Sequence, residues 1–130
     1  MIEQLLDTRV LLLFLQNDPA LPDPLAKRIE SSQNRSLVSL ASLWELSQKQ
    51  ASGLLKFEAA QRPDFPDLLI EEGFEVLPIG WSTMRRAAGL PRHHSDPTDR
   101  ILVAEAIARN IPILSLDETF DLYKIPRISG

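Results

Sequence analysis

The stretch Ile111-Pro112-Ile113-Leu114-Ser115-Leu116-Asp117 carries the strongest signal for the fold class. It is a nearly continuous apolar run of strand length that ends in an acidic residue. Such runs are typical of strands in parallel sheets, because helices bury both faces of these sheets. The stretch therefore predicts a central strand of an α/β fold, with Asp117 at its carboxyl end.

Working outward from this strand, strand and helix patterns alternate along the chain. Further strands are predicted at residues 2–6, 36–40, 74–79 and, at an edge, 125–128. Helices are predicted at residues 24–31, 41–52, 64–72, 81–90 and from Asp96 to about Asn110. In the helix at 41–52, Leu43, Trp44 and Leu46 are expected to face the core. Residues 8–16 are apolar on every face, so they fit either a buried helix or a second strand.

This alternation favours a three-layer α/β/α sandwich with a central parallel sheet, because right-handed crossovers place helices on both faces. Residues 1–130 contain no internal repeat or linker, and 44% of them are hydrophobic. We therefore expect one domain with a single core region. The sequence has no run long enough to cross a bilayer and no secretory signal pattern, so a cytoplasmic, non-membrane protein is expected.

Composition limits the chemistry that the chain can support. It has no cysteine, and its two histidines are adjacent, so any metal must be bound mainly by oxygen. The net charge of −4 gives little general attraction to a polyanion. A local group of cations is nevertheless present, and it can form a basic rim around an acidic pocket or simply be solvated: Arg85, Arg86, Arg92, His93, His94 and Arg100.

Acidic residues recur where strands end and helices begin. Asp7 follows the first predicted strand, and Asp117 follows the late one. Glu45 lies one helical turn beyond the second strand, and Asp96 and Asp99 open the helix that precedes the late strand. In open parallel sheets the functional pocket lies beyond the carboxyl ends of the strands. Carboxylates that converge there would repel one another unless a cation neutralised them, which predicts Mg²⁺ or Mn²⁺.

Each acid also has an ordinary structural explanation. Asp7 and Asp117 suit helix or turn caps, and Asp96 before Pro97 suits an N-cap. Glu45 is four residues before Lys49, the favourable order for an ion pair on a helix. The prediction of a metal site therefore depends on the common placement of these acids.

Four segments in this order resemble the PIN-domain ribonucleases, in particular the VapC-like toxins of type II toxin–antitoxin pairs. They are Leu-Leu-Asp-Thr at 5–8, Ser-Leu-Trp-Glu-Leu at 42–46, His-His-Ser-Asp-Pro-Thr-Asp-Arg at 93–100 and Leu-Ser-Leu-Asp-Glu-Thr-Phe at 114–120. The resemblance covers nearly the whole chain, and residues 93–106 are its most specific part. It implies a PIN-like sandwich and a metal-dependent endoribonuclease that hydrolyses RNA phosphodiester bonds.

The resemblance also implies residue roles. Asp7, Glu45, Asp99 and Asp117 would be the catalytic quartet around one or two Mg²⁺ or Mn²⁺ ions. Asp96 would be an additional metal-site acid, Thr8 and Ser115 would support the site, and Arg9 and Arg100 would bind substrate. Arg9 departs from the histidine that relatives often carry, and it can either contact a phosphate or pair with an acid and obstruct the site. Ser115 replaces a usual threonine. His93 and His94 are interpreted as loop residues, since no serine or cysteine nucleophile accompanies them.

Partners follow from the same resemblance: an RNA substrate, a second copy in a homodimer, and an antitoxin whose tail lies across the acidic pocket and offers it an arginine. Leu54, Leu55 and Phe57 fit either that interface or ordinary core packing. The alternative function is a catalytically inactive PIN-like module that binds RNA or protein.

Two other α/β classes with an acidic pocket fit less well. A haloacid-dehalogenase-type phosphatase needs an aspartate two residues after the first, where this chain has Arg9. A phosphoacceptor receiver domain needs a lysine after a late strand, and none directly follows Asp117.

Overall fold

The computed structural model describes residues 1–130, and a parallel sheet of five strands forms its centre. The strands, in the spatial order β3-β2-β1-β4-β5, are β1 (Ile2–Leu6), β2 (Asn34–Ser39), β3 (Glu75–Leu77), β4 (Ile113–Leu114) and β5 (Arg127–Ile128). The chain moves outward from β1 to β3 and then returns to the other side of β1. The strand order therefore reverses between β1 and β4, where open α/β sheets place their sites.

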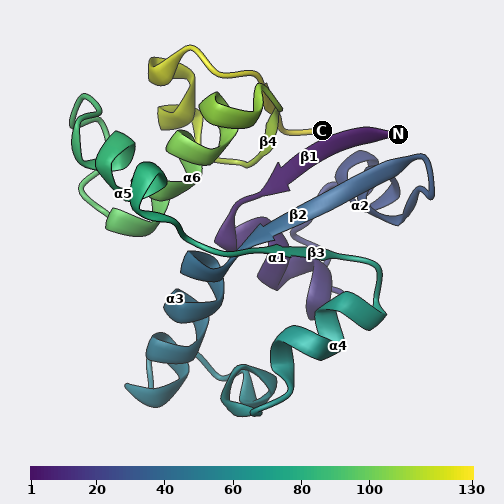
Figure 1. Cartoon of the computed structure of the whole chain (residues 1–130). Coiled ribbons are helices and arrows are strands. Elements are labelled where there is room, and N and C mark those ends of the chain that lie inside the picture. Colours follow the sequence, from purple (N-terminus) through teal and green to yellow (C-terminus); the bar gives the residue numbers. More distant parts are fainter.

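Helices cover both faces of this sheet (Figure 1). They are α1 (Thr8–Leu15), α2 (Asp23–Glu30), α3 (Leu40–Ala51), α4 (Phe65–Glu71), α5 (Trp81–Ala88) and α6 (Pro97–Arg109), with short 3₁₀ helices η1 (Glu58–Gln61) and η2 (Glu118–Tyr123). In Figure 1, α5 and α6 lie on one side of the strands, and α1 and α4 lie on the other. The predicted three-layer α/β/α sandwich is confirmed.

Alternation along the central strands produces two hydrophobic clusters. Leu6 points into the cluster that includes residues of α1 to α4, whereas its neighbour Leu5 points into the cluster beneath α6. Ile113 and Leu114 of β4 divide between the two clusters in the same way. Because successive strand residues face opposite sides, both positions must be apolar in a sheet covered on both faces.

The segment at 8–16, which fits a helix or a strand in the sequence, is α1. The Asp7 Oδ1 atom accepts a hydrogen bond of 2.7 Å from the backbone N–H of Val10 and so caps this helix directly after β1. Val10, Leu11 and Leu13 are buried. The apolar character on all sides reflects a helix packed deep in the core.

The late strand is shorter than the predicted range of 111–116. The backbone N–H of Ile111 bonds back to Ala106 at the end of α6, and Pro112 has no N–H to donate. Only Ile113 and Leu114 have strand geometry, although Ser115 still donates to the carbonyl of Ile128. The predicted edge strand forms as β5.

The prediction that Trp44 faces the core is wrong. Its neighbours Leu43 and Leu46 are buried as expected, but the Trp44 side chain is 64% exposed. Helix positions advance by about 100° per residue, and Trp44 falls outside the arc of α3 that carries its buried residues, which are Ala41, Ser42, Leu43 and Leu46. None of the helices is long and apolar enough to span a membrane.

Candidate active site

The five acids singled out from the sequence line one pocket at the carboxyl ends of β1 and β4. The pocket has a volume of about 640 Å³ and is lined by Asp7, Thr8, Arg9, Glu45, Lys49, Asp96, Asp99, Leu116, Asp117 and Glu118. Only Leu116 among these residues is apolar. Strand ends, the first turn of α6 and the second turn of α3 meet here, so residues far apart in sequence share one small volume.

Asp7 and Asp117 are held by the backbone that follows each strand. Besides capping α1, Asp7 is buried, and burial raises its pKa, with a further increase from the charge of Asp117. Hydrogen bonds from Ser115 and Val10 act in the opposite direction. Asp117 caps η2 by accepting from the N–H of Thr119 at 3.0 Å. Their capping and pocket-lining roles therefore coexist.

Asp96 and Asp99 enter the pocket from the start of α6. Asp96 is the N-cap, and its Oδ1 accepts from the N–H of Thr98 at 2.8 Å. Burial, followed by the negative charge of Asp96, raises the pKa of Asp99 to about 7, and the charges of Glu45 and Asp7 add to the rise. No hydrogen bond holds the Asp99 carboxylate. This group is poised to gain from a cation.

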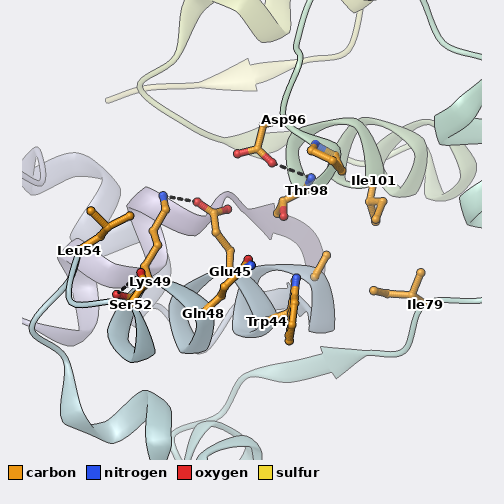
Figure 2. A pocket seen from close by; sticks show the side chains of 12 residues that line it. Trp44, Glu45, Gln48, Lys49, Ser52, Leu54, Ile79, Asp96, Thr98 and Ile101 are labelled. Atoms are coloured by element: carbon orange, nitrogen blue, oxygen red, sulfur yellow. Dashed lines mark hydrogen bonds and ion pairs between the residues drawn. The ribbon is translucent and has the colours of Figure 1, made fainter.

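Glu45 projects from α3 toward the same space, as Figure 2 shows. Its Oε2 pairs with Lys49 Nζ at 2.6 Å, which fits the ion pair expected from the sequence spacing. Its Oε1 is buried and has no hydrogen-bond partner. An unsatisfied buried carboxylate oxygen is costly, so this atom fits a site that a cation or another donor completes.

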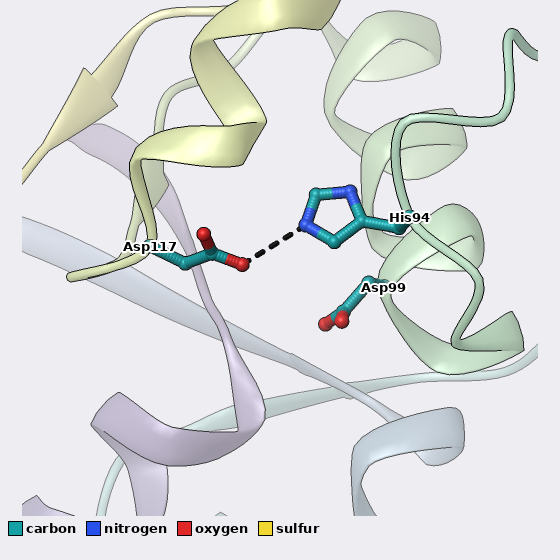
Figure 3. A group of neighbouring side chains, drawn as sticks. All are labelled: His94, Asp99 and Asp117. Atoms are coloured by element: carbon teal, nitrogen blue, oxygen red, sulfur yellow. Dashed lines mark hydrogen bonds and ion pairs between the residues drawn. The ribbon is translucent and has the colours of Figure 1, made fainter.

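His94 is a site residue that the sequence interpretation missed. It lies in the loop between α5 and α6, as expected, but it is buried, and its Nε2 is 3.0 Å from Asp117 Oδ2. Figure 3 shows the imidazole pointing toward Asp117, with Asp99 beside it. One ligand atom from each of these three residues lies within 4.8 Å of the other two. The only sequence signal for this role was its position two residues before Asp96.

Hydrogen bonds from His94 and Thr119 reverse the effect of burial on Asp117. Burial raises the pKa of this carboxyl, but the Thr119 backbone, then His94, lower it by more, so that the pKa lies below its usual value. Asp99 and Asp117 therefore have pKa values displaced in opposite directions within one pocket. Such displaced pairs are frequent at catalytic and metal sites.

Thr8 and Ser115 are buried beside the pocket. Thr8 Oγ1 donates to Ser42 Oγ at 2.9 Å, which joins the start of α1 to α3, the helix that carries Glu45. Ser115 Oγ accepts from the N–H of Asp117 at 3.0 Å. Both hydroxyls thus fix backbone segments that present acids.

The two arginines assigned to substrate binding lie in different environments. Arg9 is exposed at the pocket edge and forms no ion pair, so it does not obstruct the acids. Arg100 is buried, and its guanidinium donates to the carbonyls of Ala87, Ala88, Leu90 and Pro91. The expectation for Arg100 is therefore corrected: it ties the end of α5 to α6 and does not line the acidic pocket.

Apart from His94, which contacts Asp117, the predicted cationic group does not surround the pocket, since none of Arg85, Arg86 and Arg92 lines it. Arg85 and Arg86 are exposed on α5, and Arg92 lies with Arg100 in a separate depression. These three arginines are therefore solvated helix and loop residues and do not form a basic rim around the acidic pocket. The cations that do line the acidic pocket are Arg9 and Lys49.

A second, more apolar groove adjoins the acidic pocket (Figure 2). The two share Glu45, Lys49 and Asp96. The groove is completed by Ala41, Trp44, Gln48, Ser52, Leu54, Ile79, Pro97, Thr98 and Ile101. Leu54 is 80% exposed, whereas Leu55 and Phe57 pack against the core. Core packing therefore explains Leu55 and Phe57, whereas Leu54 is still available for an interface.

The donor atoms of the pocket suit a hard divalent cation. Carboxylate oxygens predominate, Glu45 Oε1 lacks a partner, and Asp99 is destabilised as a free anion. Asp7, Glu45, Asp99 and Asp117 can supply oxygen ligands, and Asp96 adds negative charge beside them. The arrangement can hold a cation and position an anionic ligand such as a phosphate against it.

Solved structures with the same fold come from bacterial two-protein complexes. VapBC2 from Rickettsia felis, bound to a DNA fragment from its promoter, matches with a TM-score of 0.70 and 14% identity over 98% of both chains. FitAcB from Neisseria gonorrhoeae gives 0.65 and 17% over 96% of both. DNA-bound VapBC from Salmonella typhimurium gives 0.64 and 20% over 98% of both. At these identities the likeness establishes the fold.

Sequence comparison establishes the family. No curated protein matches this chain. The family model of the PIN domain, however, matches residues 5–126, which include all five acids singled out from the sequence. Since that match spans nearly the whole chain, the protein belongs to the PIN domain family.

Proposed function

We propose that this protein is a metal-dependent endoribonuclease that uses Mg²⁺ or Mn²⁺, and that it is the toxin of a toxin–antitoxin pair. PIN domains are generally nucleases, which supports hydrolysis of phosphodiester bonds. The single observation that carries the proposal is the convergence of four acids on one pocket where the strand order of the sheet reverses. These acids are Asp7, Glu45, Asp99 and Asp117.

The pocket acids would contribute to ion binding in two ways. Asp7 and Asp117 each have one carboxylate oxygen held by a backbone N–H group, which leaves the other lone pairs for a cation. Asp99 and the free Oε1 of Glu45 have no internal partner to lose when a cation arrives. These four acids would hold a divalent ion, whose positive charge would activate a water and stabilise the leaving oxygen of the phosphodiester.

The pocket edge supplies contacts for the substrate. Arg9 is exposed and free of ion pairs, so its guanidinium can donate hydrogen bonds to a phosphate without losing an internal bond. Lys49 is 48% exposed and pairs with Glu45, so it can neutralise that acid until a cation binds. We assign phosphate binding to Arg9, support of the acids to Thr8 and Ser115, and an additional charge to Asp96.

The adjoining groove supports an antitoxin partner. Trp44, Leu54 and Ile101 offer an apolar surface that runs into the acidic pocket at Glu45. A peptide segment with apolar side chains followed by an arginine would fill the groove and neutralise the acids in place of the metal. The solved VapBC and FitAcB structures that share this fold are also two-protein complexes. We further propose a cytoplasmic homodimer held inactive in this way.

The decisive test is cleavage of a mixed structured RNA by the purified full chain with Mg²⁺, Mn²⁺ or EDTA. Asp99→Asn removes a pocket carboxylate, and Asp67→Asn is the matched control because Asp67 is exposed on α4, outside the pocket. We expect metal-dependent cutting by wild type and the control, and cutting slower by at least roughly 100-fold in Asp99→Asn. Metal binding without cutting of any RNA would instead favour the inactive binding module.

The partner is tested separately by co-expression with the adjacent open reading frame, followed by size-exclusion chromatography. A stable complex that is weakened by Leu54→Glu, but not by Glu58→Gln on η1, is expected. Absence of any complex would remove the antitoxin from the proposal and leave the nuclease untouched.

A further inference from the structure

His94 occupies an unusually ordered position for a loop residue. Its ring is buried and packs against two aromatic side chains of η2. It stacks on Tyr123 at 5.5 Å between ring centroids with a 9° interplanar angle, and it contacts Phe120 at 4.5 Å. Packing against these two rings limits the rotation of the imidazole. The ring is therefore held in one orientation before any ligand binds.

The backbone N–H and both ring nitrogens of His94 have polar partners, which further restrict the rotation of the ring. The backbone N–H of His94 donates to the Tyr123 hydroxyl at 2.9 Å, and Nδ1 lies 3.3 Å from the same hydroxyl. Nε2 lies 3.0 Å from Asp117 Oδ2. Tyr123 thus holds both the backbone and one edge of the ring, which leaves the opposite edge for Asp117.

The chemistry of the partners defines the direction of the bond to Asp117. A carboxylate oxygen only accepts hydrogen bonds, so Nε2 must carry the hydrogen. This holds whether the ring bears one proton or two. Asp117 Oδ1 already accepts from the N–H of Thr119. Both oxygens of this carboxylate are therefore held by donors of fixed position.

We propose that His94 is a positioning residue that orients the Asp117 carboxylate toward the divalent ion by donating its Nε2–H to Oδ2. The inference deepens the proposed function and rests on it. The Thr119 N–H holds only Oδ1 of Asp117, whose side chain is 45% exposed at the start of a short 3₁₀ helix, so a second donor is needed to fix the direction of Oδ2. Partners that orient a ligand contribute to metal affinity by removing this freedom.

The test measures metal binding rather than cleavage. Mn²⁺ is titrated into the full chain by calorimetry and by loss of the free-ion electron paramagnetic resonance signal, for wild type, His94→Ala and His94→Gln. The matched control is His93→Ala, because His93 is exposed, packs in a T-shaped arrangement against Tyr123 and has no hydrogen bond to a pocket acid. Thermal melts without metal identify any variant that is not folded.

The expected results follow from the donor role. His94→Ala weakens Mn²⁺ binding by about 10-fold to 100-fold, the range found for partners that orient metal ligands. His94→Gln restores most of the affinity, since the glutamine amide can place an N–H where Nε2–H lies. Tyr123→Phe causes a smaller loss, because packing still confines the ring. His93→Ala binds Mn²⁺ as wild type does.

Three outcomes would overturn the inference. Equal affinity of folded His94→Ala and wild type removes the positioning role, and so does a folded His94→Gln that binds as poorly as His94→Ala. A directly coordinated ¹⁴N coupling in the pulsed spectrum of the Mn²⁺ complex, lost in His94→Ala, identifies a ligand instead, consistent with the 4.8 Å grouping with Asp99 and Asp117. If wild type itself binds no Mn²⁺, the proposed metal-dependent function fails, and the role of His94 fails with it. If only the role of His94 is wrong, wild type still binds Mn²⁺.

Discussion

Asp117 and Asp99 face the same pocket, yet the protein treats their charges in opposite ways. Asp117 accepts hydrogen bonds from Thr119 and His94, and its pKa is lowered. Asp99 has no such donors, and burial and its acidic neighbours raise its pKa to about 7. One side of the pocket is therefore ready as an anion, whereas the other gains most when a cation arrives. A site that is fixed on one side and unsatisfied on the other is well suited to bind an ion.

The largest expected effect comes from breaking the unsatisfied side. Asp99→Asn should reduce RNA cleavage at saturating metal by at least roughly 100-fold, above the range for residues that only orient ligands. The physical reason is that the variant removes both a ligand and the charge that draws the ion. Initial rates in Mn²⁺, compared with Asp67→Asn, measure the effect, and matching rates would exclude Asp99 from the metal site.

Metal should stabilise the protein chiefly through the same carboxylate. Binding to the folded state alone at about 100 times the dissociation constant adds about 2.7 kcal/mol to the free energy of unfolding. We expect Mn²⁺ to raise the melting temperature of wild type more at pH 8 than at pH 5.5, because Asp99 must be deprotonated to bind. Thermal melts at both pH values check this, and an equal shift in Asp99→Asn would contradict it.

Without metal, the two acids should show opposite pH dependence. The folded pKa of Asp99 is above its ordinary value of 3.8, so its contribution to stability is complete below pH 3.8 and is lost as the pH rises through about 7. The pKa of Asp117 is lowered, so its contribution is present above pH 3.8 and is lost as the pH falls through the folded value.

Substitution of the two acids should change the free energy of unfolding in opposite directions. At pH 8 in EDTA, Asp99→Asn should raise the free energy of unfolding by about 1–2 kcal/mol after allowance for solvent screening. Asp117→Asn should lower it by about 0.5–1 kcal/mol, since one acceptor of two hydrogen bonds is altered. Urea unfolding measures both, and a loss of stability in both variants would mean that Asp99 is not strained by its neighbours.

The smallest effect is expected at Lys49, which pairs with Glu45 and contacts neither Asp99 nor Asp117 in an ion pair. Lys49→Met removes the cation that neutralises Glu45, so Mn²⁺ should bind severalfold more tightly at low ionic strength, the scale of an exposed ion pair. Calorimetric titration at low and high salt checks this. Lys56→Met controls for net charge, because Lys56 does not line the pocket.

Much of this architecture follows from local patterns in the chain. The apolar run before Asp117 and the strand-to-helix alternation predicted the parallel sheet, and the acids after the strands predicted the pocket, because parallel strands end at one edge. The helix at 8–16 could not be distinguished from a strand, since burial on every side removes the periodicity that separates the two. The exposure of Trp44 was missed for a related reason: hydrophobicity does not show where a groove will open.

The roles of charged side chains depended on the fold in a different way. Arg9 and Arg100 look alike in sequence, but only the packing of α5 on α6 turns Arg100 toward four carbonyls and leaves Arg9 at the pocket. His94 became a site residue only because η2 brings Tyr123 and Asp117 against it. Adjacent histidines in a polar loop carry no such information, since their partners are 23 and 29 residues away.

The sequence by itself determined the order of elements, the sheet type and the set of acids at its carboxyl edge, because these follow from periodicity and chain direction. The tertiary structure alone decided which acid is held and which is unsatisfied, which arginine is free, and that His94 joins the site. These properties depend on burial and on hydrogen bonds between distant segments, and both arise only when the layers pack together.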